Sequence, residues 1–284
     1  MDKIFWTNIG IILLILLIPG EEKGWTSEAG QGIFKLLPEM QASQTGVFDA
    51  DPFMPRLGIS KQLTSNKIIG HIGQEIDLLG LRLGKKDSTN IRLPVTVGLA
   101  GYSITLLSRN GNKFPLLAVD YLFGGYIRIP VNQFTLRFAL THISAHLGDR
   151  YMFEEDSPIK PRIYSREYIS LLLIKNHKNL RLYGGWHYIY HSIPEVEQKS
   201  FQAGFSWSAP FSGWGFRPYI SLDHRWRYNF RGRNNFSLQT GLKLEGDGGR
   251  AYRLSLNYYD GGNIFGQFFR RTSRLVGVSL LFDY

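Results

Sequence analysis

A short polar run, Thr141-His-Ile-Ser-Ala-His-Leu-Gly-Asp149, carries residue types that suit hydrolytic chemistry. His142, Ser144 and His146 alternate, and residues two apart on a strand have Cα atoms roughly 6.6 Å apart, so an imidazole can reach a hydroxyl. A serine beside a histidine is the minimal activated nucleophile, and a third group has to orient the histidine ring. We expect Asp149 or Asp156, in the loop that follows, to supply that group.

Two other interpretations of this segment stay open. His142, His146 and Asp149 could together hold a metal ion, because alternate histidines on a strand can chelate. In the structural interpretation, Asp149 caps a turn and the segment only organises the following loop. The sequence contains no phosphate-binding glycine loop, G-x-S-x-G elbow or H-E-x-x-H motif, so no cofactor is predicted.

The element that positions the three alternating residues is predicted to be a strand over 133–146. One face of this strand carries an apolar row, and His142, Ser144 and His146 continue the same row: Phe134, Leu136, Phe138, Leu140. In a membrane barrel that row faces lipid, and the long loop after the strand places its end at the outer leaflet. Polar side chains facing lipid cost free energy and usually mark function.

Eleven further strands are predicted from period-two alternation after residue 55. The last of them, 274–284, alternates Val276, Val278, Leu280, Phe282 and Tyr284. The connections are short on one side and include the longest loops on the other, which is typical of outer-membrane barrels. We therefore expect an all-β fold, a closed antiparallel transmembrane barrel of about twelve strands over 56–284, with ten or fourteen left open.

The N-terminal part is predicted to be a signal peptide over 1–24, because Lys3 precedes a short apolar run, and an irregular leader over 25–55. The chain has a formal net charge of +10 and no cysteine. Membrane lipids or lipopolysaccharide phosphates are the expected acidic partners of an exported chain, and no nucleic-acid partner is expected. We also expect a monomer, with a C-terminal strand that the barrel-assembly machinery recognises.

The inward faces of the predicted strands carry mixed charges, such as Arg137, Asp223 and Arg253. A barrel of twelve strands is narrow, so we expect these charges to pair with one another across the lumen. A narrow channel or a ligand-binding barrel is the corresponding alternative function. The primary expectation is a barrel of unassigned role, and a lipid-directed hydrolase is the other alternative.

Two family resemblances follow from these residues. The H-x-S pair on an outward-running strand resembles the active-site segments of outer-membrane phospholipase A and of the lipid A deacylases, although the phospholipase has Asn-Gly after its serine and this chain has Ala145-His146. Over roughly 45–284, the chain resembles the bacterial family called domain of unknown function 1207, on motifs that occur in this order: Ala50-Asp-Pro52, Val119-Asp-Tyr121, His142 to Asp149, Tyr164-Ser-Arg-Glu167, Leu182-Tyr-Gly-Gly185, Tyr258-Tyr-Asp-Gly261 and Gly266-Gln-Phe268. That resemblance implies an exported outer-membrane protein and leaves the activity open.

Overall fold

The computed structural model of the protein describes residues 34–36, 48–81, 95–152, 159–210, 215–227, 234–245 and 250–283. The predicted signal peptide over 1–24 and the terminal Tyr284 lie outside them. No helix in these described ranges is both long and apolar enough to cross a membrane.

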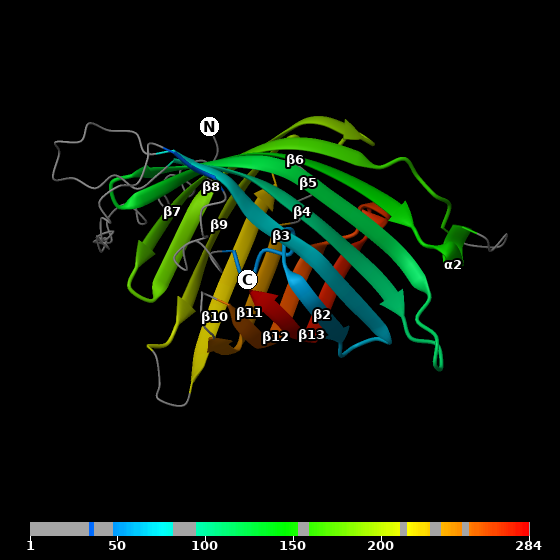
Figure 1. Cartoon of the computed structure of the whole chain (residues 1–284). Coiled ribbons are helices and arrows are strands. Elements are labelled where there is room, and N and C mark those ends of the chain that lie inside the picture. The colour runs from blue at the N-terminus through cyan, green and yellow to red at the C-terminus, as the bar shows by residue number, and fades with distance from the viewer. Residues whose placement is uncertain are drawn as a thin grey trace, which may run out of the picture.

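Twelve antiparallel strands, β2 to β13, close into one barrel, as predicted (Figure 1). Each strand pairs with its neighbours in chain order, and β13 pairs with β2 to complete the wall. The strands are β2 (Leu57–Gln62), β3 (Lys67–Leu81), β4 (Val95–Ser108), β5 (Leu116–Val131), β6 (Phe134–Leu147), β7 (Ser165–His177), β8 (Leu180–Ile193), β9 (Lys199–Ser208), β10 (Phe216–Arg227), β11 (Asn235–Glu245), β12 (Ala251–Gly262) and β13 (Thr272–Asp283).

A thirteenth strand, β1 (Phe34–Leu36), lies outside the closed barrel. It pairs with residues 79–81 of β3, on the edge where β2 pairs only with residues 68–71. The predicted irregular leader over 25–55 therefore contributes a short strand, which adds hydrogen bonds to an edge that the short β2 leaves open.

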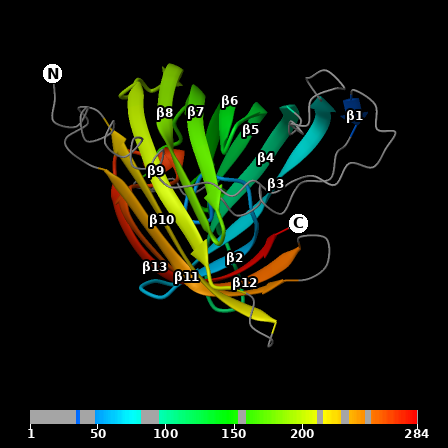
Figure 2. The same ribbon diagram turned by 90° about the vertical axis from the view of Figure 1, so that its left-hand side faces the viewer.

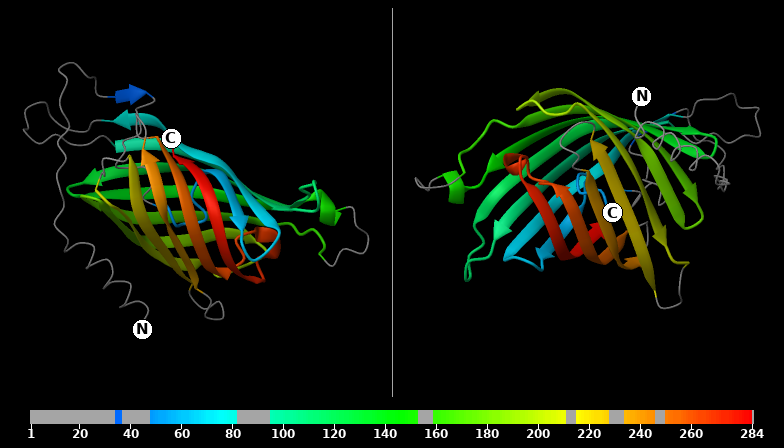
Figure 3. Two further views of the ribbon diagram at one scale, coloured as in Figure 1. Left: turned by 90° about the horizontal axis from the view of Figure 1, so that it is seen from below. Right: turned by 180° about the vertical axis from the view of Figure 1, so that it is seen from behind.

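The two ends of the barrel differ in their connections. At one end, two-residue turns at 132–133 and 178–179 join β5 to β6 and β7 to β8. Asn132 and Lys178 adopt positive φ values of 53° and 49°, the backbone conformation that tight hairpins require. The other end, here called the loop end, carries the connections 148–164 and 263–271, and Figures 1 and 3 show helix α2 (Asp149–Met152) and the orange-red connection 263–271 there together.

The outer face of the wall is apolar. Large side chains on every part of the barrel point away from the lumen, among them Phe123, Leu171, Trp186, Trp207 and Leu254. Figure 2 shows the green strands β4 to β7 facing the yellow-to-red strands β10 to β13 across the interior. The inner face carries the polar residues, which is the alternation of barrels that cross membranes.

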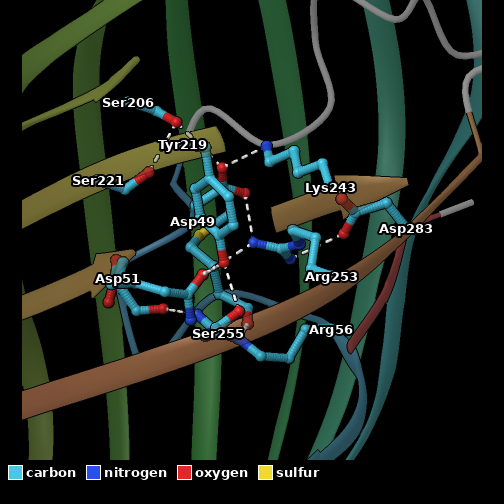
Figure 4. A network of polar contacts seen from close by, with 12 residues as sticks. Asp49, Asp51, Arg56, Ser206, Tyr219, Ser221, Lys243, Arg253, Ser255 and Asp283 are labelled. Atoms are coloured by element: carbon cyan, nitrogen blue, oxygen red, sulfur yellow. Dashed lines mark hydrogen bonds and ion pairs between the residues drawn. The ribbon is translucent and has the colours of Figure 1, made fainter. Parts of the chain in front are cut away.

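Residues 48–55, here called the lumenal segment, lie inside the barrel. Asp49 is 3% exposed and bonds Lys243 Nζ at 2.7 Å and Arg253 Nη1 at 2.8 Å (Figure 4). The Asp51 carboxylate accepts a hydrogen bond from Gln202 at 2.7 Å. The segment therefore supplies carboxylates to a cationic inner wall.

The predicted pairing of inward charges is present elsewhere in the wall too. Arg128 pairs with Asp77, and Arg137 pairs with Glu75. The lumenal segment and these pairs together occupy the middle of the barrel, which disfavours an open channel.

Residues 263–271, here called the loop cap, fold back over the lumen at the loop end. Phe265 and Phe268 are buried, and the Gly266 backbone N–H donates to Asp120 Oδ2 at 2.7 Å. The Gln267 side-chain amide donates to the carbonyl oxygens of Ala145 and Arg162. The loop cap, which includes the 3₁₀ turn η2 (Gly266–Phe268), thus fixes the end of β6 next to Ser144.

Candidate functional site

The predicted site residues lie on the outer surface of the wall, near the loop end of β6. Leu140, His142 and His146 are exposed, whereas the intervening Ile143 and Ala145 are buried against the lumen. Ser144 shares the outward parity and is partly buried by its neighbours. The apolar row of β6 therefore continues into a polar patch, as the alternation predicts.

The register of the neighbouring strands builds two rows across this patch. One row, here called the outer row, consists of Phe123 on β5, His142 on β6, Glu167 on β7 and His191 on β8. The adjacent row places Tyr121, Ser144 and Ser165 side by side. Because directly opposed residues on antiparallel strands have Cβ atoms roughly 4.5–5.5 Å apart, each row is a set of contacting side chains.

Glu167 forms hydrogen bonds with both histidines of the outer row. Its Oε1 accepts hydrogen bonds from His142 Nδ1 and from the Ser165 hydroxyl, each at 2.7 Å, and its Oε2 bonds His191 Nδ1. A carboxylate only accepts hydrogen bonds, so a proton lies on His142 Nδ1, and in the neutral ring Nε2 is the acceptor. The ring is therefore held in the tautomer that a general base needs.

Ser144 follows His142 by two residues on the same face. No hydrogen bond joins the Ser144 hydroxyl to His142 within the described ranges of the chain. Nucleophile–base hydrogen bonds in unliganded sites are often long and shorten when substrate binds. The geometry thus has an oriented imidazole and a hydroxyl two residues apart on the same face of one strand.

The carboxylate that contacts His142 belongs to a residue that sequence reasoning did not choose. Asp149 begins α2 beyond the end of the strand, is exposed, and is not the carboxylate that His142 contacts. Asp156 lies outside the described residues. Glu167 comes from the next strand, and its signal in the sequence was the Tyr164-Ser-Arg-Glu167 motif.

The three predicted metal ligands are not gathered together. Among the described residues, no group of three or more His, Asp or Glu side chains is placed to hold a metal ion. The His146 ring lies against Tyr121 on β5, with centroids 5.9 Å apart, on the side away from Glu167. His142 points the other way, toward β7, so the geometry does not support chelation by this set.

Comparison with known proteins identifies the fold and a family. The structure is similar to that of outer membrane phospholipase A from Escherichia coli, with a TM-score of 0.52, 12% identity, and coverage of 83% of this chain and 99% of that chain. An active-site mutant of the same E. coli protein gives a TM-score of 0.50 at 12% identity, over 85% of this chain and 95% of that chain. At these identities the likeness shows the outer-membrane type of barrel and nothing finer.

Comparison of the sequence finds one family model and no curated relative. A family model described as "Protein of unknown function (DUF1207)" matches residues 71–284. No curated protein matches the chain.

Proposed function

The chain belongs to the family of proteins of unknown function DUF1207, and from its outer wall we propose that it is an outer-membrane serine hydrolase that cleaves lipid esters. The observation that carries this proposal is the hydrogen bond from His142 Nδ1 to Glu167, on the same outward face of β6 as Ser144 two residues further on. In this proposal, Glu167 takes the place of the aspartate in a serine–histidine–aspartate triad.

The proposed reaction has two steps. The Ser144 oxygen attacks the ester carbonyl carbon while His142 Nε2 takes the hydroxyl proton, and that proton then passes to the departing alcohol. Water next attacks the acyl-serine and loses a proton to His142, which passes that proton to the departing Ser144 oxygen as the fatty acid is released. Glu167 stays ionised throughout and stabilises the imidazolium that forms in each step.

The surroundings of the site support a lipid substrate. Tyr121 and Phe123 on β5 are about half exposed or more and flank the rows that contain Ser144 and His142. An acyl chain that packs against these rings would bring its ester to the strand end at the loop end of the barrel. The shared fold with a protein whose name is phospholipase A makes phospholipid esters the first substrate class to test.

The proposed location is the bacterial outer membrane, with the loop end outside. The apolar outer band supports it, and a polar patch on that band is costly unless it acts on something held there. Recognition of the C-terminal strand by the assembly machinery, the monomeric state and the contact with lipopolysaccharide stay predictions.

The deciding experiment measures fatty-acid release by the purified full chain in mixed micelles of detergent with phosphatidylethanolamine or with lipopolysaccharide. We expect Ser144→Ala to abolish release and to abolish labelling by a fluorophosphonate probe. Ser103→Ala is the matched control, because Ser103 also lies on the outer wall but on β4, away from His142. Release that is absent in the wild type, or equal in Ser144→Ala, would refute the proposal.

A further inference from the structure

A cavity at the loop end of the lumen lies apart from the outer-wall site. Its lining comes from strands β4 to β10, from Phe53 of the lumenal segment, and from Asn263, Ile264 and Phe269 of the loop cap. It holds about 940 Å³ of empty space, counted with the open space at its mouth. The wall separates it from Ser144, whose side chain faces outward.

Three arginines line this cavity: Arg166 on β7 and Arg225 and Arg227 on β10. Arg225 is compensated, because its Nη2 lies 3.3 Å from Asp51 Oδ2 and 3.2 Å from Gln202 Oε1. Arg227 forms no hydrogen bond or ion pair with any residue that the structure describes, and Arg166 Nε is buried without an acceptor. Arg166 and Arg225 also act on Arg227 as neighbouring like charges.

Four other cations of the described lumen wall, Arg128, Arg137, Lys243 and Arg253, each pair with a carboxylate, although Nε of the three arginines is buried without an acceptor, as in Arg166. A cation that is withdrawn from water without a partner costs free energy, and two such cations close together cost more. The cost disappears when an anion binds between them.

The carboxylates that face the cavity form no ion pair with these two arginines, although Asp120 and Arg166 act on each other as opposite charges. Asp120 and Glu197 both line it, but no ion pair joins either of them to Arg166 or Arg227 in the described part of the chain. Asp120 Oδ2 is engaged by the Gly266 N–H, and its Oδ1 is buried without a donor. These acceptors are available for a hydroxyl or protonated group of a bound molecule.

Apolar side chains make up much of the remaining lining, including Ile104, Leu122, Ile143 and Ile264. The Arg166 guanidinium lies over the Tyr164 ring at 4.8 Å and near the Phe269 ring at 6.0 Å. Stacking of this kind holds the planar fork in place for bidentate contact with a carboxylate or phosphate. The cavity thus offers a fixed cationic group beside an apolar surface.

We infer that this cavity binds a single-chain amphipathic anion, whose carboxylate or phosphate monoester lies against Arg166 and Arg227 and whose hydrocarbon packs on the isoleucines. The site does not depend on Ser144, so a failure of the binding test leaves the proposed hydrolase standing, and the converse also holds.

The test is calorimetric titration of the full chain in detergent with hexanoate, hexyl phosphate, hexanol and inorganic phosphate. We expect saturable binding of hexanoate, hexyl phosphate or both, with the tighter of the two identifying the head group. Arg166→Gln and Arg227→Gln should each weaken that binding at least tenfold. Arg274→Gln is the matched control, since Arg274 is an exposed arginine at the same end of the barrel and should leave binding unchanged.

The melting temperature of each unliganded variant shows whether that variant is folded. Because Arg227 has no partner to lose among the described residues, Arg227→Gln should melt at or above the wild-type temperature. If that variant does not fold, Arg227→Lys should show the weakened binding, because it keeps the positive charge and loses the planar guanidinium group. The inference is overturned if neither anion binds, if both variants bind as tightly as the wild type, or if hexanol or inorganic phosphate binds as well as the amphipathic anions.

Discussion

The side-chain amide of Gln267 donates a 2.6 Å hydrogen bond to the backbone carbonyl of Ala145, the residue that follows Ser144. The same amide also donates to the carbonyl of Arg162, and the Gln267 Oε1 accepts from the Arg162 N–H at 3.1 Å. One buried glutamine from the loop cap therefore joins the end of β6 to the segment that leads into β7. These two strands carry the proposed nucleophile, base and orienting group.

Gln267→Ala should weaken both structure and activity. Removing a buried partner leaves backbone groups unsatisfied, so we expect the free energy of unfolding to fall by about 1–3 kcal/mol. Under the proposed function, kcat should fall more than KM rises, because the strand end is misplaced while the outer surface is kept. Gln267→Glu places a buried carboxylate oxygen against the two carbonyl oxygens and should cost more than Gln267→Ala. Equal kcat in all three proteins would contradict a positioning role.

Glu167→Gln tests the orienting group directly. The amide can no longer stabilise an imidazolium or fix the Nδ1 proton, so we expect lipid-ester cleavage to fall by about 10²–10⁴-fold. His191→Gln changes the other partner of the same carboxylate and should cost far less, since the His142 contact remains. A larger loss in His191→Gln than in Glu167→Gln would identify His191 as the base.

Gly266→Ala should destabilise the loop cap. A Cβ at this position would overlap the ring of Tyr164, which is buried beneath the cap. Overpacking of this kind costs about 1–3 kcal/mol, measurable as a lower melting temperature. Gly101→Ala is the control, because a Cβ there meets no atom within 4 Å. Equal melting temperatures for the two variants would show that the cap yields to the added methyl.

Asp49→Asn should destabilise the barrel from within. The change removes a buried carboxylate from Lys243 and Arg253, and breaking a buried ion pair costs about 3–5 kcal/mol. Asp260→Asn removes the partner of the exposed Arg274 and should cost about 0–1 kcal/mol. Urea unfolding followed by tryptophan fluorescence measures both, and similar losses in the two variants would contradict this account.

The acid dependence of wild-type stability has a predictable sign. Burial favours the neutral form of Asp49, but Arg253 and Lys243 outweigh it and hold the pKa of this carboxyl well below its ordinary value of 3.8. A carboxyl whose pKa is lowered by folding stabilises the folded state fully above pH 3.8, and that contribution is lost as pH falls below 3.8 through the folded value. Titration of unfolding should therefore show this loss in the wild type and not in Asp49→Asn.

The wall of the barrel could be predicted from local pattern, whereas contacts between distant segments could not. The predicted strand 133–146 corresponds to β6, Phe134–Leu147, because alternation is a property of each strand alone. Glu167 was missed because its position opposite His142 depends on register across the connection 148–164, which no local pattern specifies. The lumenal segment was missed because Asp49 and Asp51 show no periodicity, and their partners are far away in sequence.

The position of the lumenal segment also sets the smallest part of this chain that can fold by itself. The region shared with the family, 71–284, excludes β2 and residues 48–55. A fragment cut at residue 71 would have no strand to pair with β13 and no Asp49 for Lys243 and Arg253. We therefore expect the autonomous folding unit to begin at or before Phe48, and fragments chosen by family boundaries to misassemble.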